Sequence, residues 1–471
     1  MIPHVVIPAP FCTCTAAFHS NLPYSSPIRD CVRGKRFQPF SSVTTSMANA
    51  KPYDVVLFGA TSFVGVLVAE YYLKNYGATS PTFKWAIAAR SETKLSDLKG
   101  RLASEVDDSA SSLPTIIADS MDQNSLDAMV AQAKVILTTV GPYNRYGSKL
   151  VESCAREGVH LCDLTGESTW VRNMIDKHHA QAERTGAKIV PSCGFDSIPA
   201  DMGTFFMVDH MKRTHGVSPD DVRYILRASK GGGSGGTIAS AMDICSEIWS
   251  GGWKAMKKNN DPLLLAHPPA EGSSAGVRFK NVKGPGGLGY DSLAKSWTAI
   301  SVFAGHDSKV VYRSASVLGY PDTFHYKEVM GFKGLVKGVI PALLTTAAVT
   351  MAGIALLIPP TRKLLARFLP APGEGPSKEL RDNGFFWIDF IAKARAGEKD
   401  IICRAKIGSD KGDPGYKETA KMLAECGLCL ALDEDRLESK KGGVLTTATA
   451  MGMPLIERMR AAGMTFEVVQ G

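Results

Sequence analysis

The sequence lacks the features that mark several classes of protein. Its formal net charge is only +8 over 471 residues and no basic stripe with interleaved aromatic residues is present, so we expect no nucleic-acid partner. A hydrophobic content of 44% and a charged content of 21% exclude a disordered chain. No internal repeat is visible, and the length predicts two or three domains.

Cysteine is sparse and scattered. The ten cysteines lie mostly in apolar runs, which excludes a secreted disulfide framework and favours reduced, buried thiols. Cys426 and Cys429 form a C-x-x-C pair, but no second pair and no pair of histidines stands near them. We therefore expect core cysteines in an apolar helix, and no metal site.

A Tyr followed four residues later by a Lys is also absent. That pair supplies the proton in short-chain dehydrogenases, so its absence argues against this class.

The first 46 residues are rich in Ser, Thr and Pro. Their basic residues include Arg29, Arg33, Lys35 and Arg36, against the single acid Asp30. This composition is typical of an organelle transit peptide, for a plastid or a mitochondrion. The alternative is an untranslated or disordered leader ahead of a start at Met47.

From Tyr53 onward, apolar strand-like runs alternate with helical patterns. This alternation predicts an α/β fold, with a Rossmann-type parallel sheet over residues 51–197. Residues 198–439 predict an inserted α+β domain, with antiparallel strands that include "DVRYILRAS", "SWTAISVFAG" and "SKVVYRSASVL". The C-terminal residues 440–471 are expected to return to the first domain.

The stretch "VVLFGATSFVG" carries the first functional signal. Gly59 ends a strand and Gly65 lies in the first turn of a helix, where free N–H groups receive a pyrophosphate. Ser62 stands where a middle Gly is usual, and we interpret its hydroxyl as a donor to a phosphate oxygen. The alternative is a turn between strand and helix without a ligand.

The end of the second strand favours NADP(H) over NAD(H). Arg90, Ser91 and Lys94 offer two cations and a hydroxyl to a 2′-phosphate, where NAD-binding chains usually place an acid. Gly141 and Pro142 follow the fourth strand, where the nicotinamide is expected. The full set of expected cofactor-binding residues is Gly59, Thr61, Ser62, Phe63, Val64, Gly65, Arg90, Ser91, Lys94, Gly141 and Pro142.

Residues 338–358, "GVIPALLTTAAVTMAGIALLI", contain no charged residue. A helix of this length reaches across about 30 Å, the thickness of a bilayer core. Basic residues flank it, and "TRKLLARFL" follows as a short amphipathic segment. We predict membrane association, as a span or a monotopic anchor; the alternative is a buried helix or a homodimer helix.

Several motifs together resemble the saccharopine dehydrogenase-like oxidoreductases, which are related to bacterial trans-acting enoyl reductases. The motifs are "GATSFVG", "AARSETKL", "GPYNRYG", "CDLTGE", "CGFDSIPADMG", "PGEGPS", "GDPGY" and "GGVLTTATAMG". The resemblance covers about residues 51–471. The family usually has "GATGFTG", so Ser62 and Val64 depart from it, although neither change removes the donors at the helix start.

The resemblance implies a Rossmann domain closed by the C-terminal segment, and membrane or lipid-droplet association for members with an apolar segment at this place. We therefore expect an NADPH-dependent oxidoreductase that reduces a lipid-like enoyl or carbonyl substrate. The alternatives are a non-catalytic NADP(H)-binding scaffold and a saccharopine-type amino-acid dehydrogenase. Tyr143 and Asp196 are the candidate proton donors, although Asp196 also suits a capped turn between domains.

Overall fold

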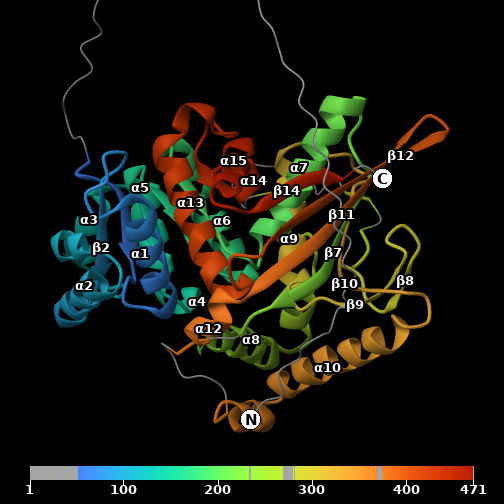
Figure 1. Ribbon diagram of the computed structural model, residues 1–471, viewed down its shortest axis with the longest axis horizontal. Coiled ribbons are helices and arrows are strands. Elements are labelled where there is room, and N and C mark those ends of the chain that lie inside the picture. Colours follow the sequence, from blue (N-terminus) through green and yellow to red (C-terminus); the bar gives the residue numbers. More distant parts are fainter. Residues whose placement is uncertain (1–50, 233–234, 269–278, 281, 369–373, 470–471) are drawn as a thin grey trace, which may run out of the picture. The chain divides into compact units, whose positions relative to one another are not determined.

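The computed structural model describes residues 51–232, 235–268, 279–280, 282–368 and 374–469, which form one compact unit beginning at Lys51 (Figure 1). The predicted transit peptide, residues 1–46, lies outside the described residues.

Seven parallel strands form the first sheet, in the order β13-β6-β5-β4-β1-β2-β3. The strands are β1 (Tyr53–Phe58), β2 (Trp85–Ala89), β3 (Thr115–Ile117), β4 (Ala133–Thr138), β5 (His160–Cys162), β6 (Lys188–Val190) and β13 (Gly443–Val444). Most residues of the central strands are fully buried, as expected for strands covered on both faces. The order reverses between β1 and β4, which is where such sheets bind nucleotides.

Helices from distant parts of the chain cover this sheet. Those between its strands are α1 (Phe63–Tyr76), α2 (Glu92–Glu105), α3 (Gln123–Val130), α4 (Tyr143–Tyr146), α5 (Ser148–Glu157) and α6 (Ser168–Thr185), with a 3₁₀ turn at Asp108–Ser112. Helix α13 (Thr419–Leu432) packs beside α1 and against β4 (Figure 1). Cys426 and Cys429 lie buried in α13, as the apolar pattern predicts.

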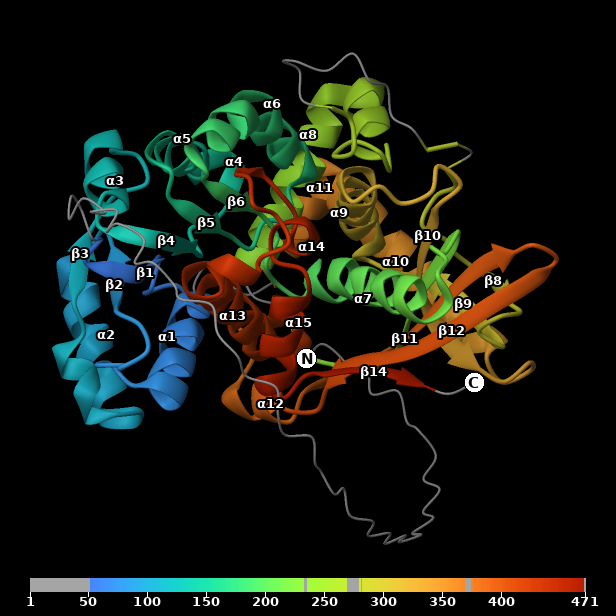
Figure 2. The same ribbon diagram turned by 90° about the horizontal axis from the view of Figure 1, so that it is seen from above.

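The second sheet is mixed, in the order β14-β12-β11-β7-β10-β9-β8. Its strands are β7 (Asp221–Lys230), β8 (Gly289–Asp291), β9 (Ser296–Ile300), β10 (His325–Lys333), β11 (Phe385–Ala396), β12 (Lys399–Ser409) and β14 (Thr465–Val469). The remaining helices are α7 (Ile198–His215), α8 (Gly235–Asn259), α9 (Ala304–Val317), α10 (Val339–Leu357), α11 (Pro359–Leu365), α12 (Lys378–Asp382), α14 (Thr447–Ala450) and α15 (Met453–Ala461). Figure 2 shows α7 lying along the face of this sheet. A π-helical turn spans Pro414–Glu418 and a 3₁₀ turn spans Glu434–Arg436.

The structure corrects three parts of the predicted organisation. The stretch "SKVVYRSASVL" lies in helix α9 and its C-terminal end, not in a strand, and β7 pairs with β10 in parallel. Strand β14 pairs with β12 in the second sheet, so the return of the C-terminal segment to the first sheet is made by β13 alone. Helix α13, predicted within the second domain, covers the first sheet because its apolar residues pack against β4 and β5.

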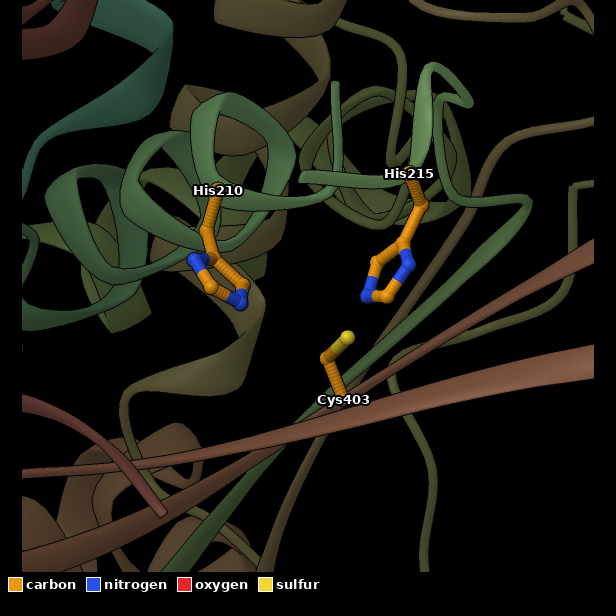
Figure 3. A group of neighbouring side chains, drawn as sticks. All are labelled: His210, His215 and Cys403. Atoms are coloured by element: carbon orange, nitrogen blue, oxygen red, sulfur yellow. The ribbon is translucent and has the colours of Figure 1, made fainter. Parts of the chain in front are cut away.

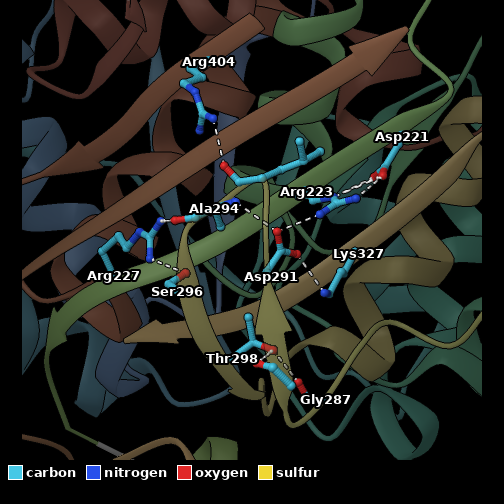
Figure 4. A network of polar contacts seen from close by, with 12 residues as sticks. Asp221, Arg223, Arg227, Gly287, Asp291, Ala294, Ser296, Thr298, Lys327 and Arg404 are labelled. Atoms are coloured by element: carbon cyan, nitrogen blue, oxygen red, sulfur yellow. Dashed lines mark hydrogen bonds and ion pairs between the residues drawn. The ribbon is translucent and has the colours of Figure 1, made fainter. Parts of the chain in front are cut away.

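A buried ionic cluster joins the strands of the second sheet (Figure 4). The carboxylate of Asp291 is fully buried and lies 2.7 Å from Arg223 and 2.9 Å from Lys327. Burial alone would raise the pKa of Asp291, but the hydrogen bonds and charges of these partners hold it below its ordinary value. The cluster fixes β8 against β7 and β10.

Helix α10 lies on the surface. Of its 19 residues only Ala342 is buried, so the helix is not part of the core. Among the described residues it is the one helix long and apolar enough to cross a membrane, a test of length and composition alone.

Candidate functional site

The turn after β1 has the geometry of a nucleotide-binding turn. Gly59 has a φ of +84°, a left-handed conformation that favours glycine. At Gly65 a Cβ atom would lie 2.2 Å from the carbonyl oxygen of Gly59, so α1 packs directly on the turn. Both glycines are therefore required by the backbone, as the sequence predicts.

Ser62 is the N-cap of α1. Its Oγ accepts a hydrogen bond from the N–H of Gly65 at 3.0 Å and lies 2.8 Å from the hydroxyl of Thr139. Because Thr139 donates its own proton to the carbonyl of Gly59 at 2.9 Å, the proton of Ser62 is directed to Thr139. The hydroxyl of Ser62 thus joins the turn to the end of β4, and its donation to a phosphate stays a prediction.

Free donors remain at the start of α1. Among the described residues, the backbone N–H groups of Thr61, Phe63 and Val64 have no hydrogen-bond partner. They point outward from the positive end of a 14-residue helix, an arrangement that binds a diphosphate. The departures of Ser62 and Val64 from the family motif leave these donors intact.

Two later segments close over the start of α1. The ring of Phe63 packs edge-on against Tyr416 at 5.3 Å between centroids, and the guanidinium of Arg381 lies 5.2 Å from the centre of the Phe63 ring. A Cβ atom at Gly375 would lie 2.3 Å from the same ring. Gly375 of "PGEGPS" and Tyr416 of "GDPGY" therefore flank the start of α1, a role that their sequences did not reveal because it depends on the fold.

The end of β2 presents charge to solvent. The side chains of Arg90 and Lys94 are exposed, and no hydrogen bond or ion pair joins either side chain to another described residue. Ser91 caps α2 by accepting a hydrogen bond from the N–H of Lys94 at 3.3 Å. The two cations are thus free to meet a 2′-phosphate.

The turn after β4 begins with a cis peptide bond between Gly141 and Pro142. The next residue, Tyr143, is buried, and its hydroxyl donates to the carbonyl of Thr138 at 3.2 Å and accepts from the N–H of Leu164 at 3.0 Å. Burial raises the pKa of Tyr143 well above its ordinary value. The interpretation of Tyr143 as a proton donor is therefore wrong: this hydroxyl ties the turn to the residues that follow β5.

Glu167 fixes the same turn from the other side. Its carboxylate accepts the backbone N–H groups of Tyr143 and Asn144 at 2.9 and 2.8 Å. Burial raises the pKa of Glu167, and these hydrogen bonds lower it. The expected nicotinamide turn is thus held by the hydroxyl group of Tyr143 and by the backbone N–H groups of Tyr143 and Asn144.

A polar network lies at the ends of β5 and β6. Asp163 accepts the N–H groups of Thr165 and Ser192, each at 2.9 Å, and burial raises its pKa to about 7. Ser192 has a φ of +65°, which is strained for a residue other than glycine. His306 of α9 lies 2.9 Å from Ser192 and 2.8 Å from Ser168. Burial lowers the pKa of His306 to about 3, so the imidazole is neutral.

Asp196 follows this network at the junction of the two sheets. The residue is half-buried, and burial raises the pKa of its carboxyl group to about 6. The next residue, Ser197, donates its hydroxyl proton to the buried Asp307 of α9 at 3.3 Å. Asp196 thus lies beside a second acid that the sequence did not single out.

Asp307 in turn shares a hydrogen bond with Glu328 of β10, and both carboxyl groups are buried. Glu328 also accepts the hydroxyl groups of Ser301 at 2.7 Å and Tyr326 at 3.0 Å. Burial raises the pKa of both acids. The charge of Glu328 raises the pKa of Asp307 further, whereas the hydrogen bond with Asp307 lowers the pKa of Glu328. The pair therefore holds at least one proton near neutral pH.

Helix α8 lies against the nicotinamide turn and the start of α6. Its side-chain contacts are Ser240 with Glu167 at 3.2 Å, Asp243 with Arg145 at 2.7 Å, and Glu247 with Thr169 at 3.0 Å. The same helix packs against α10. It therefore connects the expected reaction site with the exposed apolar helix.

Comparison with known proteins matches residues 55–190 to the saccharopine dehydrogenase NADP binding domain. A Mycobacterium tuberculosis protein, provisionally named a trans-acting enoyl reductase, is 37% identical over 431 residues, covering 90% of this chain and 99% of that protein. The trans-acting enoyl reductase of Mycobacterium bovis BCG is 35% identical over 419 residues, covering 88% of this chain and 97% of that enzyme.

Among solved structures, apo saccharopine dehydrogenase (L-Glu forming) of Saccharomyces cerevisiae is similar with a TM-score of 0.47 and 12% identity, covering 89% of this chain and all of that one. This structural similarity is too low to support a functional conclusion. The sequence similarities do show the family. The chain belongs to the saccharopine dehydrogenase-like oxidoreductases, the family of the trans-acting enoyl reductases, and is an NADP-dependent oxidoreductase.

Proposed function

We propose that this protein uses NADPH to reduce an enoyl or carbonyl group of a lipid-like substrate at the surface of a membrane or a lipid droplet. The name of its relatives, trans-acting enoyl reductase, supports the type of reaction. The observation that supports a lipid substrate and a membrane contact is helix α10, which is apolar along its length and has a single buried residue, Ala342.

The residues at the phosphate turn fit the cofactor. The free N–H groups of Thr61, Phe63 and Val64 would hold the diphosphate. Arg90 and Lys94 would hold the 2′-phosphate, and the nicotinamide would lie at the turn that follows β4. When bound, NADPH supplies the hydride of the reduction.

We assign the proton to Asp196. In the balanced reaction, one carbon of the double bond gains the hydride and the other atom gains a proton, while NADPH becomes NADP⁺. Asp196 loses that proton from its carboxyl oxygen and regains one from solvent. The raised pKa of Asp196, about 6, suits a group that exchanges protons near neutral pH.

The buried pair behind Asp196 supports this assignment. Asp307 and Glu328 hold a proton within the protein, and the hydroxyl of Ser197 contacts Asp307 at 3.3 Å. Asp196 is thus the partly exposed end of a group of acids that otherwise lies in the core.

The membrane contact would be made by α10 and the segment after it. The exposed apolar side chains there include Ile340, Leu344, Met351, Ile354, Leu364 and Phe368. Lys333 and Lys337 precede the helix, and Arg362, Lys363 and Arg367 follow it, so basic groups can reach lipid headgroups at both ends. Helix α8 packs against α10 and contacts the nicotinamide turn, so it links this surface with the expected reaction site.

The first experiment is vesicle flotation of the full-length protein, a deletion of residues 338–368, and the double variant Ile340→Glu/Leu344→Glu. We expect the full-length protein to float and both altered forms to stay in solution while still binding NADPH. Val317→Glu, which adds a charge at an exposed apolar residue of another helix, is the control and should float. A full-length protein that is monodisperse and does not float with vesicles would contradict the membrane proposal. It would indicate that α10 forms a homodimer interface.

The second experiment follows NADPH oxidation with three kinds of substrate: unsaturated acyl lipids in vesicles, lipid aldehydes or ketones in vesicles, and amino acids with oxo acids in solution. We expect turnover with an acyl lipid or a carbonyl lipid. Turnover with the amino-acid pair alone would indicate a saccharopine-type dehydrogenase. NADPH binding without turnover of any substrate would indicate a scaffold.

The proposal of a plastid or mitochondrial location rests only on the composition of residues 1–46. A fusion of residues 1–46 to a fluorescent protein should enter a plastid or a mitochondrion; diffuse fluorescence would leave the lipid droplet or another membrane as the location.

A further inference from the structure

Three side chains that are distant in the sequence converge beside the second sheet. His210 and His215 lie in the last turns of α7, and Cys403 lies on β12, against which α7 packs. Figure 3 shows the three side chains turned toward one common space. The imidazole nitrogens and the thiol sulfur that could act as ligands all lie within 4.8 Å of one another.

These ligand atoms are not used by other contacts. Among the described residues, no hydrogen bond or ion pair engages either imidazole ring or the thiol. Cys403 is nearly buried, with 8% of its surface exposed, whereas His215 is exposed and its ring can move. Access from solvent is therefore open on the side of His215.

We propose that His210, His215 and Cys403 form a site for a thiophilic divalent metal ion of the zinc class. Two imidazoles and one thiolate suit Zn²⁺ or Co²⁺, whereas Mg²⁺ and Ca²⁺ need carboxylate and carbonyl oxygens. Three such ligands around zinc lie roughly 3.5 Å apart, so a small rotation of the exposed His215 ring closes the site. Water fills the fourth position.

Binding replaces the proton of the Cys403 thiol. The Sγ–H bond breaks, the proton passes to solvent, and the sulfur bonds to the metal without any change of oxidation state. The charges near His210 have both signs, because Arg213 lies 3.3 Å from the carboxylate of Asp209.

The bound ion would link the end of α7 to β12. Since α7 begins at Ile198, directly after the acids at the junction of the sheets, this link would fix the far end of the helix that extends from the reaction site. The expected effect is greater stability of this packing, independent of NADPH.

The test uses the full-length protein and the metal alone. Co²⁺ should bind with one equivalent at this site and give the sulfur-to-cobalt charge-transfer absorption of a thiolate ligand; Zn²⁺ should displace it and raise the melting temperature. Cys403→Ser should abolish the absorption, and His215→Ala should weaken Co²⁺ binding at least about tenfold. Since His215 is exposed, its variant should fold normally, which circular dichroism checks.

Cys245→Ser, at a half-buried thiol on α8, is the matched control and should bind Co²⁺ like the wild type. The proposal fails if the wild type shows no charge-transfer absorption. It also fails if Cys403→Ser retains that absorption in full, because the metal would then be bound by cysteines elsewhere in the chain.

Discussion

The hydroxyl groups of Ser62 and Thr139 lie 2.8 Å apart and join the phosphate turn to the end of β4. The family motif has a glycine at the place of Ser62, so this chain has replaced a flexible residue with a helix cap. The side chain of Ser62 accepts from the N–H of Gly65, and the N–H groups of Thr61, Phe63 and Val64 stay free.

Removing the hydroxyl of Ser62 should lower the stability of the protein more than it weakens cofactor binding. Ser62→Ala loses the cap of α1 and should lower the free energy of unfolding by about 1 kcal/mol. Ser62→Gly should keep NADPH binding within about tenfold of the wild type, because the backbone donors remain. Chemical denaturation and fluorescence titration measure the two effects. A loss of binding in Ser62→Gly far beyond this range would mean that the hydroxyl contacts the phosphate after all.

Arg90 should decide between the two nicotinamide cofactors. Arg90→Ala removes a charge-assisted contact with the 2′-phosphate and should weaken NADPH binding by about 1.5–3 kcal/mol, with a much smaller effect on NADH. Arg101→Ala, at an exposed arginine of α2, the helix that follows Arg90, is the control and should bind both cofactors normally. Equal losses for NADPH and NADH would place the 2′-phosphate elsewhere.

Tyr143→Phe should behave as a structural variant. It leaves the carbonyl of Thr138 and the N–H of Leu164 without their buried partner, which should cost about 1–3 kcal/mol of stability. The pH profile of turnover should keep its shape, because this hydroxyl does not donate the reacting proton. A stable variant that has lost only the chemical step would restore Tyr143 as the donor.

The buried carboxyl groups of Asp307 and Glu328 should make the stability of the protein depend on pH. In the native state the pKa of Glu328 is raised above its ordinary value of 4.5, so the native protein binds more protons than the unfolded chain above that pH. The free energy of unfolding should then fall as pH rises from about 4.5 toward neutrality, by at most about 1.4 kcal/mol per pH unit for one proton.

Glu328→Gln removes the titrating group and should flatten this dependence. Thermal melts of both proteins between acidic and neutral pH measure it. Glu418→Gln is a useful comparison, since Glu418 is also buried but lies 2.8 Å from the cation of Lys421. Identical pH profiles for the wild type and Glu328→Gln would show that the pKa of Glu328 is not raised in the native protein.

The sequence predicted the parts of the site that depend on neighbours along the chain. The strand, the turn at Gly59 and the start of α1 are set by a few consecutive residues, so spacing alone identified them. Arg90 and Lys94 could be placed for the same reason, since they follow directly on β2.

Other parts depend on contacts across long separations. His306 meets Ser168 across 138 positions, and nothing in "AGHDS" indicates that contact. Helix α9 was predicted as a strand because its residues are buried on nearly every side, which removes the one-sided apolar pattern of a surface helix. The sequence also did not predict the Asp307–Glu328 pair or the His210–His215–Cys403 group, because each combines residues of different elements.

The most direct test of the account follows deuterium from labelled NADPH into an unsaturated lipid presented on vesicles. Mass spectrometry of the wild-type product should show a single deuterium from the cofactor and a proton from water, and Asp196→Asn should bind NADPH normally while forming product at least about tenfold more slowly. Asp209→Asn, at an acid outside the site, should match the wild type. Labelled NADPH that binds but leaves no deuterium in any enoyl or carbonyl lipid would contradict the proposed reductase.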